Sequence, residues 1–258
     1  MKGKIRFQKH HLRILIELVK SEFKLRYQNS VLGYCWTLMK PLLLFGVIYL
    51  VFSVFMQSPI TNYPVYLLLG IILWNFFAEA TLIGMNSLLA KRDLVTKIYF
   101  PRSVIVFAST ISSLVTLLLN LVIFFMFMII SGVAIQPAAF FFIIYVGELY
   151  LVATGVTLLL ASFYLRFRDL QHIWEILLQI GFWLTPIVYP VTIVPVQYHR
   201  YIFLNPLARI IEYSRDIFIR HHIPDLGLNL VLAVMSAVIF GIGYAIFKSQ
   251  SGKIAERI

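Results

Sequence analysis

Chemically active side chains are rare in this sequence, and the most conspicuous are three carboxylates in apolar surroundings. Glu79, Glu148 and Glu175 lie within or beside long apolar runs. A carboxylate in hydrocarbon is costly unless it is paired, protonated or in contact with water, so each is a functional candidate. An ion relay would need them close together near the membrane midplane, but they occupy three different runs. They are either parts of an ion pathway or packed structural groups and rim positions.

The remaining reactive residues show no spacing typical of a catalytic, metal or nucleotide site. The six histidines include adjacent pairs, which cannot both face one metal ion from a helix, and no Cys or Asp/Glu cluster stands beside them. Cys35 is the single cysteine, which excludes an internal disulfide. The pattern GxxxxGK(S/T) is absent, so the chain cannot hydrolyse ATP by itself. We predict a non-enzymatic chain without cofactor or metal, driven by a partner or an ion gradient.

The composition is that of an integral membrane protein. Of the 258 residues, 60% are hydrophobic and only 13% are charged, too few to cover a soluble globule. The net charge of +11 comes from basic residues beside apolar runs, as expected for loops that face anionic lipid and cytosol. Because a continuous basic stripe is missing, we expect membrane lipids and no nucleic acid as partners.

Six apolar runs have the length of membrane spans, and we predict an all-α fold of six transmembrane helices in a single domain, 1–258. Residues 1–35 form an amphipathic interface helix with a loop, 36–247 the bundle and 248–258 a tail. In the interface helix, apolar residues recur at helical spacing between His11 and Tyr27. The spans are expected at Trp36–Met56, Val65–Leu89, Val104–Ile130, Phe140–Tyr164, Ile173–Tyr189 and Leu226–Phe247.

Prolines mark where these helices should begin or stop. Pro41 is expected in the first turn of its span, where a missing N–H matters little. Pro186 and Pro190 should bend or end the fifth span. The segment Val191–Asp225 is too charged to span and too apolar for a free loop, so we expect short helices at the external mouth between spans five and six.

Basic residues also predict the orientation. Eighteen of the 22 Lys and Arg residues fall on one side of the predicted bundle. By the positive-inside rule, both termini are cytoplasmic in a multi-pass protein of the cytoplasmic (inner) membrane.

A charged loop from Ala90 to Arg102 admits two interpretations. It is either a solvated turn made basic by topology, or a short helix that docks on a cytoplasmic subunit and transmits its motion. The coupling candidates are Lys91, Arg92, Asp93, Lys97, Pro101 and Arg102. The 40 aromatic residues likewise serve mainly packing and lipid contact, although a subset could line a pore for sugar rings.

Several short motifs in order along the chain resemble one family of transporters. The first set is Arg26-Tyr27, Ser30, Leu32-Gly33, Trp36 and Pro41-Leu42. The later ones are Phe100-Pro101-Arg102, Phe167-Arg168-Asp169, Thr185-Pro186-Ile187 with Tyr189-Pro190, and Asn205-Pro206-Leu207. Together they resemble permease subunits of ABC exporters for lipid-linked polysaccharides, of the O-antigen and teichoic-acid type. Thr185 stands where these proteins often have Ser, which preserves the hydroxyl.

The resemblance implies a half-transporter. Two copies would form a channel, and two copies of a separate ABC ATPase, which hold ATP and Mg, would bind on the cytoplasmic side. The substrate would be a glycan on undecaprenyl diphosphate, moved outward. The alternatives are an ABC permease for another lipid or drug, an ion-coupled secondary transporter and a non-transporting assembly protein.

Residue roles follow from that implied substrate. Its diphosphate needs cations at headgroup depth, and Lys24, Arg26 and Lys40 are placed for this, beside Tyr27 and a turn at Gly33. The alternative for these cations is ordinary lipid anchoring. The external mouth is expected at Pro186, Tyr189, Pro190, Asn205 and Pro206.

Overall fold

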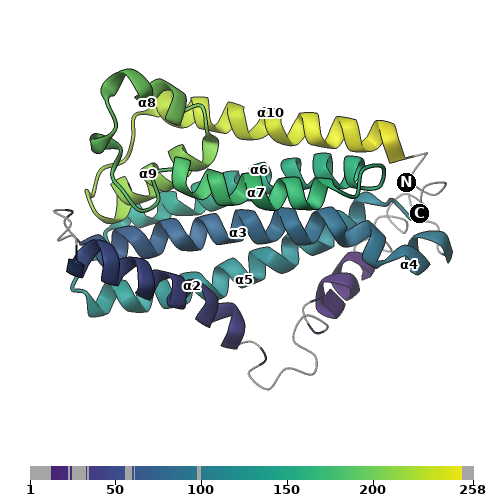
Figure 1. The fold of residues 1–258 in the computed structure, drawn as a ribbon, viewed down its shortest axis with the longest axis horizontal. Coiled ribbons are helices and arrows are strands. Elements are labelled where there is room, and N and C mark those ends of the chain that lie inside the picture. The colour runs from purple at the N-terminus through teal and green to yellow at the C-terminus, as the bar shows by residue number, and fades with distance from the viewer. Residues whose placement is uncertain are drawn as a thin grey trace.

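The computed structural model describes residues 13–22, 24, 33, 35–55, 60, 62–97 and 100–251, and within these ranges it contains helices and no β-strand. The predicted all-α membrane fold is therefore confirmed. Most helices run along one long axis, with the short helices at its two ends (Figure 1). The labelled helices are α2 (Cys35–Tyr49), α3 (Tyr63–Ala90), α4 (Arg92–Lys97), α5 (Ser103–Ile130), α6 (Phe142–Tyr164), α7 (Leu170–Leu184), α8 (Val196–Ile202), α9 (Pro206–Phe218) and α10 (Leu226–Gln250).

Five of these segments are long and apolar enough to cross a membrane, and each matches a predicted span to within a few residues. Two are composite. A π-helical segment, η1 (Leu50–Phe55), extends α2, and a 3-10 turn, η2 (Pro137–Phe141), precedes α6. A further 3-10 turn, η3 (Val191–Ile193), lies before α8. Pro41 was expected in a first turn but lies inside α2.

The structure differs from the prediction at the fifth span. Its helix, α7, has 15 residues, which cover about 22 Å at 1.5 Å per residue, whereas the hydrocarbon core is about 30 Å thick. The helix ends because Thr185 precedes Pro186 and adopts the extended conformation that a following proline favours (φ −80°, ψ 136°). Six complete spans therefore stay a prediction, in which α7 and the segment after it would share the fifth crossing.

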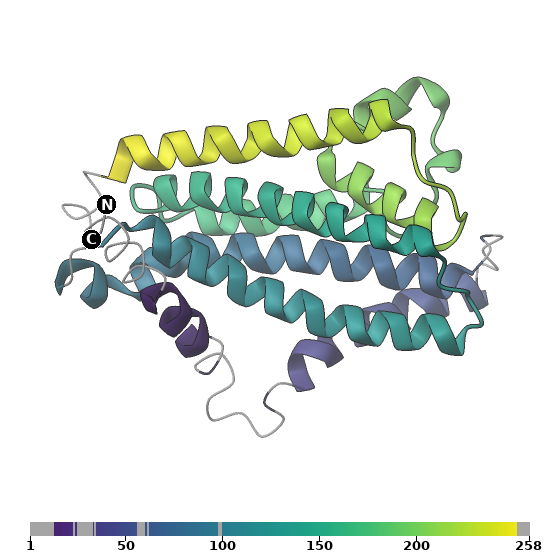
Figure 2. The same cartoon turned by 180° about the vertical axis from the view of Figure 1, so that it is seen from behind.

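Helix α3 lies at the centre of the bundle and α2 at its margin. Helices α2, α5, α6, α7 and α9 all contact α3, as the two opposite views show (Figure 1 and Figure 2). In their most apolar stretches, 72% of α3 is buried but only 17% of the 35–55 segment. Much of α2 is thus left without a partner among the described residues.

Small residues let the central helices approach closely, as is typical of membrane bundles. A Cβ on Gly243 of α10 would lie 2.0 Å from the carbonyl oxygen of Gly155 on α6. On α3, a Cβ at Gly84 would lie 2.2 Å from the side-chain methyl of Thr157. These contacts fix α6 between α3 and α10 with little room for sliding.

Candidate functional site

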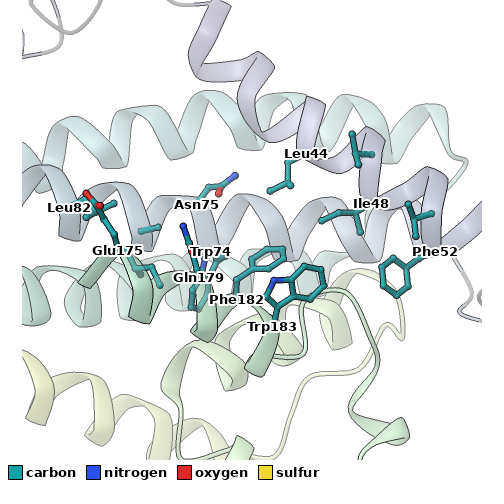
Figure 3. A pocket seen from close by; sticks show the side chains of 14 residues that line it. Leu44, Ile48, Phe52, Trp74, Asn75, Leu82, Glu175, Gln179, Phe182 and Trp183 are labelled. Atoms are coloured by element: carbon teal, nitrogen blue, oxygen red, sulfur yellow. The ribbon is translucent and has the colours of Figure 1, made fainter. Parts of the chain in front are cut away.

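A groove of about 660 Å³ opens between α2 with η1, α3 and α7. Figure 3 shows Glu175 and Leu82 at one end of it and Phe52 at the other. Its lining is mostly apolar and aromatic, with two amides and one carboxylate. The lining residues are Leu44, Val47, Ile48, Val51, Phe52, Trp74, Asn75, Ala78, Leu82, Glu175, Leu178, Gln179, Phe182 and Trp183.

Aromatic rings form one wall of this groove. The rings of Trp74 on α3 and Phe182 on α7 meet edge to face, with centroids 6.2 Å apart, and Trp183 meets Phe182 at 5.4 Å. Gly181 makes this possible, because a Cβ there would lie 2.9 Å from Cη2 of Trp74. Trp183 remains 56% exposed, so its ring is available to a ligand.

Polar groups follow a second stripe along α7. Gln171, Glu175 and Gln179 are four residues apart and therefore share one helix face. Nε2 of Gln171 donates to Oε1 of Glu175 at 3.0 Å, and the hydroxyl of Tyr164 donates to Oε1 of Gln171 at 3.2 Å. Glu175 and Gln179 line the groove opposite Asn75 of α3. The groove thus offers aromatic faces beside hydrogen-bonding groups, which suits a ligand with apolar ring faces and polar edges.

A smaller pocket of about 240 Å³ lies on the α5 side of α2. Lys40 of α2 and Glu79 of α3 both line it, and Asn75 belongs to this pocket and to the groove. Among the carboxylates that sequence analysis singled out, Glu79 and Glu175 therefore face different cavities. Glu148 is buried in α6, and its Oε2 has no hydrogen-bond partner among the described residues. The described residues do not assemble the three into one relay.

The predicted phosphate-binding residues are only partly described. Lys24 and Lys40 are exposed. Gly33 has φ +46°, a left-handed conformation that glycine adopts without strain. Arg26 and Tyr27 lie outside the described residues. The structure therefore places Lys40 beside a polar pocket but does not test a joint site.

The predicted coupling loop contains a short helix, α4, and is tied to the N-terminal helix. Nζ of Lys91 lies 2.5 Å from Oε1 of Glu22, and both side chains are largely buried (16% and 13% exposed). Ile14 and Leu18 of the N-terminal helix pack against an apolar cluster with Leu88. Lys91 therefore forms a largely buried ion pair within the chain, whereas sequence analysis considered it for a docking surface.

Lys97 is the last residue of α4. Of the other residues of that loop, Arg92, Asp93 and Pro101 are exposed and Arg102 is half-buried. These four residues lie on the surface of the bundle at its α4 end.

At the opposite end, α9 is held by a buried arginine that sequence analysis missed. Arg215 is fully buried. Its guanidinium donates to the carbonyl oxygens of Tyr66 (3.1 Å), Pro186 (2.6 Å) and Ile187 (2.7 Å), and to Oε1 of Glu212 (2.8 Å). One side chain thus joins α3, α9 and the segment after α7. The signal available in the sequence was the oppositely charged pair Glu212 and Arg215, three residues apart in an amphipathic segment.

The predicted mouth residues lie at the same end of the bundle, and Pro186 accepts a hydrogen bond from Arg215. Asn205 caps α9 by accepting from the N–H of Leu207 at 3.0 Å, and its amide donates to Oγ1 of Thr185 at 3.1 Å. Pro206 follows as the first residue of α9, a position that suits proline. The hydroxyl of Tyr66 lies 3.1 Å from the carbonyl oxygen of Tyr189. Pro190 is extended and lies directly before η3.

The outer edge of α9 carries further charge. Arg220 donates to Asp216 and contacts Oε2 of Glu212 at 3.4 Å. Burial raises the pKa of Asp216, although the hydrogen bond and positive charge of Arg220 act in the opposite direction. This end of the bundle is therefore a fixed polar network.

Comparison with known proteins finds relatives that align along nearly the whole chain. The O-antigen export system permease protein RfbA of Myxococcus xanthus is 33% identical over 251 residues, 95% of each chain. A protein of the same name from Klebsiella pneumoniae is 27% identical over 247 residues, 94% of each chain. The polysialic acid transport protein KpsM of Escherichia coli is 26% identical over 237 residues, 89% of this chain and 90% of the relative.

A family model agrees with these relatives. The model described as ABC-2 type transporter matches residues 14–219, which include the groove, the coupling loop and α9. On this match, the chain belongs to the ABC-2 type transporter family.

Proposed function

We propose that this chain is the membrane-spanning half of an ATP-driven exporter that moves polysaccharide on undecaprenyl diphosphate outward from the cytoplasm. The observation that carries the proposal is the groove between α2, α3 and α7, in which aromatic rings face amides and a carboxylate. Sugar rings have the same dual character, with C–H faces that pack on aromatic planes and hydroxyls that hydrogen-bond. Relatives named for O-antigen and polysialic acid transport support a glycan as the cargo.

A second copy of the chain would complete the channel. The groove is open on one side, and the segment 35–55 buries only 17% of its apolar stretch within the chain. Two copies related by a two-fold axis would each present the same surface to the other. A homodimer would thereby enclose a path lined by both grooves.

Energy would come from two copies of a cytoplasmic ABC ATPase, which hold ATP and Mg. The sequence contains no phosphate-binding loop of its own. We place the ATPase contact at α4 and the adjoining N-terminal helix, because charged and exposed residues such as Arg92 and Asp93 lie there. By the positive-inside rule, this α4 end is cytoplasmic, both termini lie in the cytoplasm, and α8 and α9 face outward from the inner membrane.

The lipid diphosphate would bind at the cytoplasmic side of α2. Lys40 lines the polar pocket on the α5 side of α2 and forms no ion pair among the described residues. Lys24, Arg26 and Tyr27 would add contacts, and the turn at Gly33 would let the chain pass close to the substrate. The alternative role of these cations is lipid anchoring.

Truncation of the aromatic wall tests the proposal. In the complex with its ATPase, reconstituted in vesicles, Trp183→Ala should reduce glycan export about fivefold, because it removes a stacking surface worth about 1 kcal/mol. Assembly should be unaffected, since Trp183 is 56% exposed. Ile180→Ala is the matched control on the same helix, at an exposed position outside the groove. Normal export by Trp183→Ala would refute a path along this groove.

A further inference from the structure

The charge of the groove is set by one side chain. Among the described residues that line it, Glu175 is the only charged one, and the other polar groups are the amides of Asn75 and Gln179. No lysine or arginine lines the groove within the described part of the chain. A negatively charged ligand would therefore meet a carboxylate without an opposing cation.

Among the described residues, neither oxygen of Glu175 pairs with a lysine or arginine. Its Oε1 accepts from Gln171, a neutral amide, and its Oε2 lies 3.7 Å from Nδ1 of His172, which is 78% exposed and carries a charge only when protonated. The side chain is 41% exposed, so it can reach a ligand in the groove.

The carboxylate of Glu175 attracts neutral sugars and repels acidic ones. A sugar hydroxyl can donate a charge-assisted hydrogen bond to it, which is stronger than a bond between neutral groups. A uronic or sialic carboxylate has no proton to donate and is repelled. That repulsion is stronger in a groove with apolar walls than in water, because the effective dielectric constant is lower.

We infer that Glu175 makes this groove selective for uncharged glycans over acidic ones. The inference rests on the proposed function, because it assumes that glycan passes along the groove. Gln179, one turn further along α7, and Asn75 on α3 also line the groove and would supply donors and acceptors for successive hydroxyls. In a homodimer both copies of Glu175 would face the same path, which would strengthen the selection.

The test compares two undecaprenyl-diphosphate-linked oligosaccharides of equal length, one of neutral hexoses and one containing hexuronic acid. Each is offered to the chain in complex with its ATPase in vesicles, and the ratio of neutral to acidic transport is measured. Wild type should favour the neutral glycan, and Glu175→Gln should lower the ratio about tenfold. Glu175→Lys should invert the preference. Glu17→Gln is the control, because Glu17 is an exposed carboxylate outside the groove.

The outcomes separate this inference from the proposed function. If wild type transports both glycans equally, or if Glu175→Gln leaves the ratio unchanged, Glu175 does not select cargo although export stands. If neither glycan moves with any variant, the proposed function fails as well. A ratio that changes equally in Glu17→Gln would show a general charge effect and would overturn the role of Glu175.

Discussion

At the scale of single residues, Arg215 has the most consequences for the fold. Its guanidinium is fully buried and is shared among three backbone carbonyls and Glu212. Removing one partner of a buried ion pair leaves an uncompensated charge, which costs about 3–5 kcal/mol. The arginine therefore fixes α9 and the segment after α7 to α3.

Substitution of Arg215 should destabilise the fold. Arg215→Met removes a donor from each of three carbonyls and the buried cation beside Glu212, which keeps only the hydroxyl of Tyr66 and the half-exposed Arg220. We expect a loss of about 3 kcal/mol in unfolding free energy. Arg215→Lys should not rescue it, because a lysine lacks the planar fork that reaches several carbonyls. Thermal unfolding in detergent measures both. Arg200→Met on α8, which is exposed, is the control, and equal melting temperatures for Arg215→Met and wild type would contradict the prediction.

Sequence analysis singled out Pro186, Asn205 and Pro206 but did not single out Arg215. A proline restricts its own backbone and the side chain of Asn205 caps the backbone two residues further on, so Pro186, Asn205 and Pro206 could be recognised locally. The bonds of Arg215 to Tyr66 and Pro186 join residues 149 and 29 positions apart. Such partners depend on how the helices pack, which local patterns do not encode.

At the scale of elements, the N-terminal helix and the coupling loop form one unit. The ion pair between Glu22 and Lys91 and the packing of Ile14 and Leu18 join them. Movement of α4 by a docked ATPase would therefore be passed to the helix that precedes the proposed phosphate site. Glu22 was not predicted, because it is separated from Lys91 by 69 residues.

Breaking this ion pair should loosen the N-terminal helix. Lys91→Met leaves the largely buried Glu22 unpaired and should cost between about 1 and 3 kcal/mol of local stability. Hydrogen exchange of residues 13–22 should become faster, and the exchanged pair Glu22→Lys with Lys91→Glu should partly restore protection. Lys20→Met, which breaks an exposed pair with Glu17, is the control. An unchanged rate of hydrogen exchange in Lys91→Met would mean that the ion pair between Glu22 and Lys91 does not hold the N-terminal helix.

Charge reversal on the outer surface of the loop tests the docking site. Asp93→Lys and Arg102→Glu should each weaken copurification of the ATPase or uncouple ATP hydrolysis from export, because docking depends on complementary charge at the rim. Arg166→Glu, at another exposed turn outside the proposed docking surface, serves for comparison. Normal assembly and export by both loop variants would show that the loop is a solvated turn and does not dock the ATPase.

At the scale of the whole molecule, hydrophobic periodicity predicted much more of the bundle than of its cavities. A long apolar run is almost sufficient to predict a helix such as α3 or α5, because a membrane leaves few other structures possible. Helix α7 was predicted too long, since the extended residues after Leu184 are as apolar as a helix. The groove could not be predicted, because it requires knowing that Trp74 and Phe182 meet across two helices.

Transport by the proposed complex should depend on nucleotide and not on an ion gradient. Within the described residues, Glu79 and Glu175 line separate cavities and Glu148 is buried in a third helix. This arrangement does not favour the ion-coupled alternative. In the proposed complex, an ATPase partner, a second copy and the groove would together provide a route whose energy comes from outside this chain.

The most direct test measures movement of a labelled undecaprenyl-diphosphate-linked glycan across vesicles that contain this chain and its ATPase. We expect movement with ATP and Mg, none with a nonhydrolysable ATP analogue, and no response to a pH gradient alone. Vesicles with the chain but without the ATPase should be inactive. Glycan movement driven by a pH gradient without nucleotide would overturn the proposed function, as would a lack of movement when ATP is hydrolysed by the intact complex.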